Sequence, residues 1–211
     1  MTALHVPEHF PEHYSDFTVK WASLEWEIQQ ALALRRDVFC QEQGLFEHSD
    51  RDDIDDQAQC LVAIANHGGW PDKVVGTVRI HQYSAGVWWG SRLAVQREFR
   101  HHAGIGAALI RLAVGSANGM GCTQFFAQVQ QQNEMLFQKL HWHSRYPLTV
   151  RQRPHVMMEA ELSRYPACHT PHTGYVLKGQ IAATPDEIAP CLLHVHRDAA
   201  LQRNGSHHVA H

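Results

Sequence analysis

The sequence predicts an α/β (α+β) fold in which helices flank a mixed, mostly antiparallel twisted sheet. Helical and strand periodicities alternate along the chain, which indicates both kinds of element in one fold. Three short β-rich runs follow one another across turn-forming segments, as antiparallel strands do. The chain has 211 residues, of which 44% are hydrophobic, and this is enough to bury one sizeable core.

The first amphipathic helix is expected over residues 24–39, where apolar residues recur at intervals of three and four. Glu25 and Glu27 would lie in its first turn, which the helix dipole favours for acids. The acidic stretch 47–56 follows and has no periodicity, so we interpret it as a loop.

Three consecutive antiparallel strands are expected over residues 60–65, 74–81 and 87–95. The segments His67–Gly69 and Ser84–Gly86 separate them and have the composition of turns.

Helical and strand patterns also alternate in the second half of the expected domain. Residues 104–118 have one apolar helical face, and the glycines within 119–121 provide a stop. A strand is expected over 123–129, then a short helix capped by Asn133, and residues 155–162 alternate as a strand does.

The composition changes after residue 162, where prolines and histidines accumulate. We therefore expect a domain over residues 1–162 and a partly helical extension over 163–211. Thr184–Glu187 has the form of a capping box, and 190–202 is a candidate helix. Residues after 203 are expected to be disordered.

The formal charge of −3 gives no electrostatic reason to expect nucleic acid or an anionic membrane as a partner. No apolar run approaches the ~20 residues that cross a bilayer, and residues 1–13 lack the regions of a signal peptide. We therefore expect a cytoplasmic protein without a membrane partner. The sequence leaves open whether the protein forms a homodimer.

Cysteines and histidines give no firm sign of a metal or a disulfide framework. The 5 cysteines are odd in number and have no C-x-x-C spacing, so we expect reduced thiols. Among the 18 histidines, the closest pairs are His141 with His143 and His194 with His196. The second pair falls in a candidate helix, where that spacing separates the side chains, and we predict no metal site.

A glycine-containing turn joins the third strand to the second helix in the run His101, His102, Ala103, Gly104, Ile105, Gly106 and Ala107. The small residues of this run therefore lie where the first unpaired N–H groups of a helix point outward. Such a turn can cradle a pyrophosphate, although glycine also opens helices for packing reasons.

Three segments together resemble the GNAT N-acetyltransferase superfamily. Residues 93–95, 100–106 and 109–110 resemble its motif A, with Gly104 and Gly106 at the two small positions. Residues 133–142 resemble motif B, and 34–44 resemble the first helix, so the similarity spans roughly 18–162. More narrowly, 90–95 with 128–133 resembles the GNAT-type domains of bacterial nitrilase-associated gene clusters.

The resemblance implies a transferase that uses acetyl-CoA, or another acyl-CoA, to acylate a small amine. In this family, N–H groups of the fourth strand polarise the thioester carbonyl while a base collects the amine proton. The cofactor contacts that follow are Leu93, Ala94, Val95, Arg100, His101, His102, Ala103, Gly104, Ile105, Gly106, Ala107, Asn133 and Phe137.

The base must be an acid, a histidine or a water chain. By their order in the chain, Glu42 and the acidic loop at 52–56 are the nearest candidates, and we choose Glu42. Asp52 and Asp55 would favour a cationic substrate, although a solvated acidic loop is the commoner fate of such runs. Arg79 and Trp89, each mid-strand, are the further substrate candidates. Motif B usually supplies a tyrosine as the acid, and phenylalanine at position 137 cannot donate a proton.

Two alternatives to an N-acyltransferase remain. An enzyme similar to acyl-homoserine-lactone synthases is suggested by the arrangement of Arg35, Phe39, Asp52, Asp55 and Arg79. Such an enzyme uses S-adenosylmethionine and an acyl-carrier protein. The missing tyrosine instead suggests a noncatalytic module that binds acyl-CoA.

Overall fold

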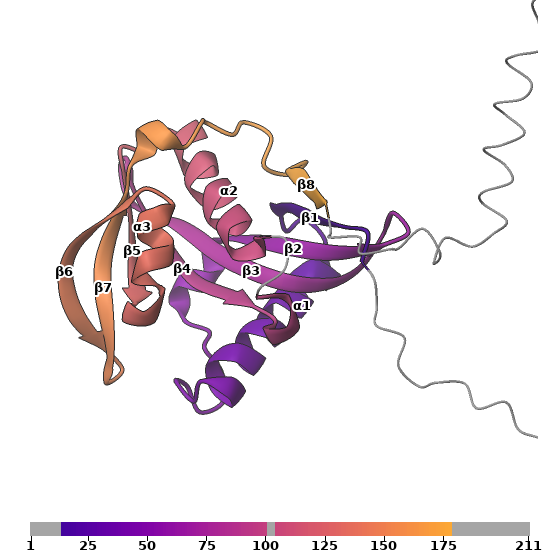
Figure 1. Cartoon of the computed structure of the whole chain (residues 1–211), viewed down its shortest axis with the longest axis horizontal. Coiled ribbons are helices and arrows are strands. Elements are labelled where there is room, and N and C mark those ends of the chain that lie inside the picture. The colour runs from indigo at the N-terminus through magenta and orange to yellow at the C-terminus, as the bar shows by residue number, and fades with distance from the viewer. Residues whose placement is uncertain (1–13, 101–103, 179–211) are drawn as a thin grey trace, which may run out of the picture. The chain divides into compact units, whose positions relative to one another are not determined.

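A computed structural model describes residues 14–100 and 104–178. They build one eight-stranded sheet in the order β6-β7-β5-β4-β3-β2-β1-β8 (Figure 1). The strands are β1 (Asp16–Trp21), β2 (Gln59–His67), β3 (Trp70–Ser84), β4 (Val87–Val95), β5 (Gln124–Gln130), β6 (Trp142–Val150), β7 (Arg153–Ala160) and β8 (Tyr175–Lys178). Neighbouring strands pair antiparallel except β4 and β5, which are parallel, so the expected mixed, mostly antiparallel sheet is confirmed.

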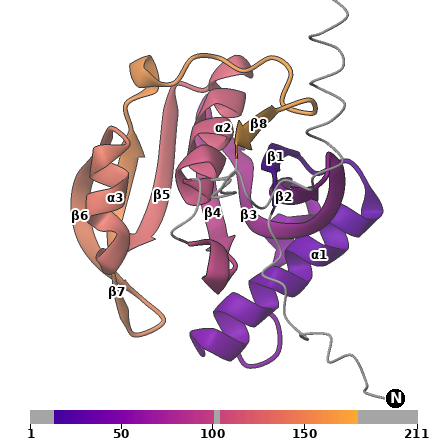
Figure 2. The same ribbon diagram turned by 45° about the vertical axis from the view of Figure 1, so that its right-hand side comes forward.

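Helices cover both faces of this sheet (Figure 2). They are α1 (Glu25–Arg36), α2 (Ile105–Gly119) and α3 (Glu134–Lys139). One core cluster packs α1 against β2 and β3, and a larger one packs α2 and Phe137 of α3 against the opposite face. Apolar side chains on both faces of β2 and β3 are therefore buried, as the continuous burial within these strands indicates.

Helix α1 begins for a local reason and continues into a π-helix. The Glu27 carboxylate accepts hydrogen bonds from the backbone N–H groups of Ser23 (2.8 Å) and Leu24 (3.1 Å), which satisfies two otherwise unpaired donors. The helix that we expected to end at residue 39 continues as a π-helix over Asp37–Glu42. Such π segments are rare and often lie beside functional sites.

Three strands escaped the sequence analysis. Strand β6 lies at one edge of the sheet and is mostly exposed, so it lacks the apolar run of a buried strand. Strands β1 and β8 are short, and β8 forms the other edge by pairing with β1. The described part of the expected extension packs against the rest of the fold: Tyr165 is buried, the Cys168 N–H donates to the Gly115 carbonyl of α2 at 2.8 Å, and β8 pairs with β1. The expected domain bounds stay a prediction. The features expected over 184–187, 190–202 and beyond 203 lie outside the described residues.

Among the helices of the described residues, none is long and apolar enough to cross a membrane. Cys40, Cys60, Cys122 and Cys168 are free thiols.

Candidate functional site

The sheet opens between its two parallel strands. Strands β4 and β5 pair only from Val87 to Gly90 and from Gln124 to Ala127. Beyond this junction the strands separate, and their remaining backbone groups on this side have no strand partner. A bulge in β4 accompanies the opening: Arg92 has a φ of 56°, and the register against β3 shifts there.

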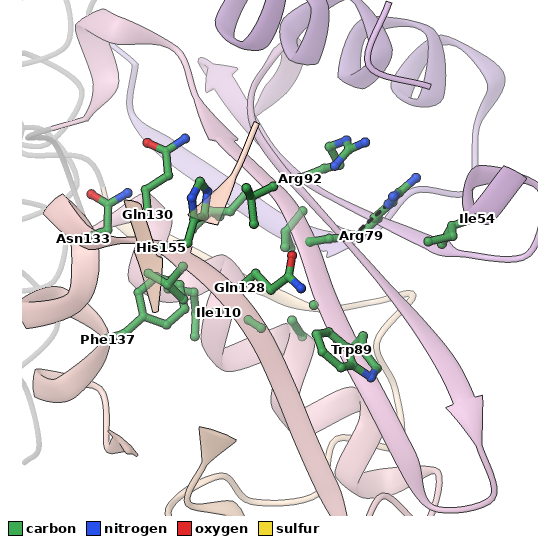
Figure 3. A pocket seen from close by; sticks show the side chains of 18 of the residues that line it. Ile54, Arg79, Trp89, Arg92, Ile110, Gln128, Gln130, Asn133, Phe137 and His155 are labelled. Atoms are coloured by element: carbon green, nitrogen blue, oxygen red, sulfur yellow. Dashed lines mark hydrogen bonds between the residues drawn. The ribbon is translucent and has the colours of Figure 1, made fainter. Parts of the chain in front are cut away.

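A cavity of about 510 Å³ occupies this opening (Figure 3). We call its apolar part the inner chamber, which lies on the α2 side of the sheet. The inner chamber is lined by Ile110, Ala113, Val114, Phe125, Phe137 and Trp142. The outer part is polar and lies on the α1 side, where its lining includes Arg79, His81, Ser91, Arg92 and Gln128. In Figure 3 Arg79 and Ile54 lie at one end of the cavity, and Phe137 and Asn133 at the other.

The predicted cradle lies where α2 begins. Gly104 has a φ of 64°, a left-handed conformation that favours glycine, and having no side chain it cannot cap the helix. A Cβ atom at Gly106 would meet only the Val95 side chain, at 3.8 Å, so an anion has room to approach the first N–H groups. His101, His102 and Ala103, the other expected contacts in this turn, lie outside the described residues.

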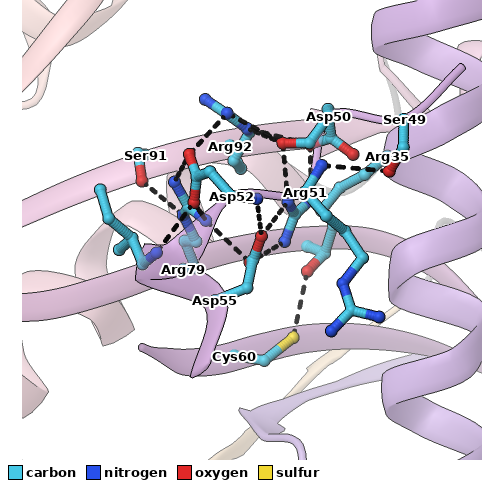
Figure 4. A network of polar contacts seen from close by, with 12 residues as sticks. Arg35, Ser49, Asp50, Arg51, Asp52, Asp55, Cys60, Arg79, Ser91 and Arg92 are labelled. Carbon is cyan, nitrogen blue, oxygen red and sulfur yellow. Dashed lines mark hydrogen bonds and ion pairs between the residues drawn. The ribbon is translucent and has the colours of Figure 1, made fainter. Parts of the chain in front are cut away.

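The acidic loop forms an ion-pair network with three arginines from three elements (Figure 4). The arginine–aspartate network consists of Arg35 on α1, Arg79 on β3, Arg92 on β4, and Asp50, Asp52 and Asp55 in the loop.

Most of this network is buried. The Asp55 carboxylate lies 2.6 Å from Arg35 and 2.8 Å from Arg79, and its side chain is 8% exposed. Asp50 contacts Arg35 at 2.7 Å and is 2% exposed. The expectation of a solvated loop is therefore wrong for these two aspartates, because arginines from the sheet and α1 remove them from water.

The charges in the network also cancel, since it contains three arginines and three aspartates. Burial favours the neutral form of Asp55, but hydrogen bonds from Arg35 and Arg79 outweigh it and hold the pKa of this carboxyl well below its usual range. The hydrogen bond from Arg79 likewise lowers the pKa of Asp52. Both acids are ionised but neutralised, so they give the cavity no net negative charge to attract a cationic substrate.

Glu42, our candidate base, lies outside this cavity. Its carboxylate binds both terminal nitrogens of Arg100, each at 2.6 Å, and this hydrogen bonding lowers its pKa. Arg100 also donates to the Val95 carbonyl at 3.0 Å. A carboxylate held by a guanidinium is a poor proton acceptor, so the structure argues against Glu42 as the base. The same ion pair occupies the Arg100 side chain, which is therefore not free to bind a phosphate.

His81 is the functional candidate that the sequence analysis missed. It lies on β3 two residues after Arg79 and lines the polar part of the cavity. Its Nδ1 atom is buried and has no hydrogen-bond partner within the described part of the chain. Burial, aided by the charge of Arg79, lowers its pKa, so the imidazole is neutral at pH 7. The signal was its period-two spacing from Arg79, which places both side chains on one face of a strand.

Other predicted residues are divided between the cavity and its surroundings. Leu93, Asn133, Phe137 and Trp89 line it, as does Asp52 of the network. The other predicted contacts within the described residues do not line it: Asp55, Ala94, Val95, Arg100, Gly104, Ile105, Gly106 and Ala107. Trp88, next to Trp89, is buried in the core on the opposite face. The described residues contain no group of three or more potential ligands placed to hold a metal ion.

Comparison with known proteins relates this geometry to a family. Residues 19–142 match the Acetyltransferase (GNAT) family. A search of curated proteins gave no match. None of the comparisons bears on the narrower similarity to nitrilase-associated domains, which stays a prediction.

Solved structures share the fold. A protein from Lactobacillus plantarum assigned as an N-acetyltransferase is 22% identical, with a TM-score of 0.62 over 69% of this chain and 98% of that one. An acyl-CoA N-acyltransferase from Pseudomonas aeruginosa is 19% identical, with a TM-score of 0.56 over 69% and 99%. The CoA-dependent acyl-homoserine lactone synthase BjaI, solved with SAM and isopentyl-CoA, is 18% identical, with a TM-score of 0.56 over 68% and 82%.

Proposed function

The chain belongs to the GNAT acetyltransferase family, and from this we propose that it is an N-acyltransferase that moves an acyl group from CoA to a small amine. The observation that carries the proposal is the opening between β4 and β5, with the cavity inside it. A strand pair that ends at Gly90 and Ala127 leaves backbone donors available to an extended ligand.

The described residues fit an acyl-CoA. The left-handed Gly104 and the open space at Gly106 suit a diphosphate at the start of α2. Leu93, beside the bulge, lines the cavity where a thioester carbonyl would meet backbone N–H groups of β4. When bound, acyl-CoA would supply the activated carbonyl on which the amine acts.

We assign the base to His81. A neutral imidazole in the polar part of the cavity can accept the proton that the amine loses, and the lowered pKa keeps it neutral at pH 7. Its unpartnered Nδ1 atom is available as a hydrogen-bond acceptor if the proton is carried by Nε2.

The test measures thiol release from acetyl-CoA and longer acyl-CoAs with a panel of polyamines, amino acids and aminoglycosides. His81→Gln should lower kcat by about a hundredfold or more while CoA affinity, measured by calorimetry, is retained. For the wild type, kcat at saturating amine should fall as the pH is lowered through the pKa of His81, which lies below 6.5. His67→Gln, an exposed histidine on the same sheet, is the matched control. Equal rates in His81→Gln and the control would remove His81 as the base.

An enzyme similar to acyl-homoserine-lactone synthases is the second candidate. The structure brings Arg35, Asp52, Asp55 and Arg79 into one network and places Phe39 in the cavity wall. Calorimetry with S-adenosylmethionine separates the two candidates: binding at the polar part of the cavity favours the synthase, and its absence beside CoA binding favours the amine acyltransferase.

A further inference from the structure

The inner chamber is a space in the hydrophobic core that no side chain fills. Its six lining side chains are at most 6% exposed, and Val114 is completely buried. Protein interiors are normally packed as densely as organic crystals, with few voids larger than a water molecule. An unfilled space among such side chains costs stability, so its presence calls for an occupant.

The chemistry of the walls makes that occupant apolar. The one polar atom of its aromatic side chains, Trp142 Nε1, donates to the Tyr165 hydroxyl at 3.0 Å. The buried side-chain atoms that lack a partner in the described part of the chain are His81 Nδ1 and Trp88 Nε1, and neither residue belongs to the chamber. Water needs two to four polar partners to occupy a cavity, and these six side chains offer no free one.

The position of the chamber relates it to the thioester. Val95 packs beside Gly106 at the open end, and Leu93 is two residues back along β4, about 7 Å at strand rise. Val114 is eight residues along α2 from Gly106, about 12 Å at helix rise. Phe125 pairs with Trp88, beyond the Gly90 junction. The chamber therefore continues past the level of Leu93, toward the closed end of the opening.

We propose that the inner chamber binds a linear acyl chain longer than acetyl, as part of the acyl-CoA substrate. The inference rests on the proposed function, which places the thioester at Leu93. The polar part of the cavity is left for the amine, because its charged and amide side chains would be desolvated by a hydrocarbon chain.

The test is a calorimetric series on the full chain with CoA, acetyl-CoA, butyryl-CoA, hexanoyl-CoA and octanoyl-CoA. Each methylene that enters the chamber should tighten Kd about fourfold, since a buried methylene contributes about 0.8 kcal/mol, until the chamber is full. Ala113→Val narrows the chamber and should end this gain at a shorter chain. Ala117→Val is the matched control, because Ala117 is buried one turn further along α2 but does not line the cavity.

The results distinguish a failure of the acyl-chain site from a failure of the proposed function. Tightening with chain length that Ala113→Val truncates and Ala117→Val preserves supports the chamber. Equal affinity for CoA and all acyl-CoAs overturns the chamber and leaves the proposed function standing. No binding of any CoA overturns the proposed function and the chamber with it. If Ala113→Val fails to fold, as judged by circular dichroism, the wild-type series alone decides between these outcomes.

Discussion

Replacing Asp55 by asparagine removes one charge from the arginine–aspartate network while preserving the volume of the side chain. Asp55 is 8% exposed and pairs with Arg35 and Arg79, which are 4% and 3% exposed. Breaking a buried pair by removing one partner typically costs about 3–5 kcal/mol, because the remaining charge is left uncompensated. The asparagine oxygen can still accept one hydrogen bond, so we expect the lower end, about 3 kcal/mol.

Urea unfolding measures this loss. With a slope of about 2 kcal/mol per M, the midpoint of Asp55→Asn should fall by about 1.5 M relative to wild type at pH 7. The pKa of Asp55 is lowered in the folded state, so its contribution is complete above its ordinary value of about 3.9 and is lost as the pH falls below it. The difference between the two proteins should therefore shrink as the pH is lowered from 4.

Asp56→Asn is the matched control, since Asp56 is exposed and lies one position further along the same loop. Its free energy of unfolding should stay within about 0.5 kcal/mol of wild type, which is a midpoint shift of at most about 0.25 M at the same slope. If Asp55→Asn and Asp56→Asn unfold at the same urea concentration, the network does not hold the loop to the sheet, and our account of the polar part of the cavity fails.

Two further substitutions address the cofactor. Gly106→Glu should abolish CoA binding by calorimetry, because it adds bulk and negative charge at the cradle, whereas Gly106→Ala should fold, since its Cβ would meet only Val95 at 3.8 Å. A folded Gly106→Glu protein with unchanged CoA affinity would remove the cradle. The Phe137 ring lines the cavity and packs on Trp142, with 5.1 Å between the ring centroids. Phe137→Tyr adds a hydroxyl to this ring, and turnover should rise up to about a hundredfold if that hydroxyl reaches the CoA thiolate. If both proteins bind acetyl-CoA but neither releases thiol with any amine, the noncatalytic binding module becomes the better interpretation.

The sequence determined those elements whose patterns are local. Apolar periodicity predicted α1 and α2, which each bury one face against the sheet, and apolar β-rich runs predicted the central strands, which are covered on both faces. Gly104 and Gly106 predicted the cradle, since a left-handed residue and an open approach are requirements of the backbone itself. The exposed edge strand β6 and the four-residue β8 carry no such pattern, because their pairing partners rather than their own burial define them. Strand β1 does alternate, with Phe17 and Val19 buried, and the sequence analysis missed that signal.

The site depended on contacts between distant segments. Asp50 and Asp55 looked like a solvated loop because their partners, Arg35 and Arg79, are at least 15 residues away and come from another layer and another strand. Glu42 seemed free until the fold placed Arg100, 58 residues on, beside it. The inner chamber is a space rather than a residue pattern, since its walls come from α2, β5, α3 and β6. Only the tertiary structure could decide these features, because charge pairing and packing depend on distances that no local pattern encodes.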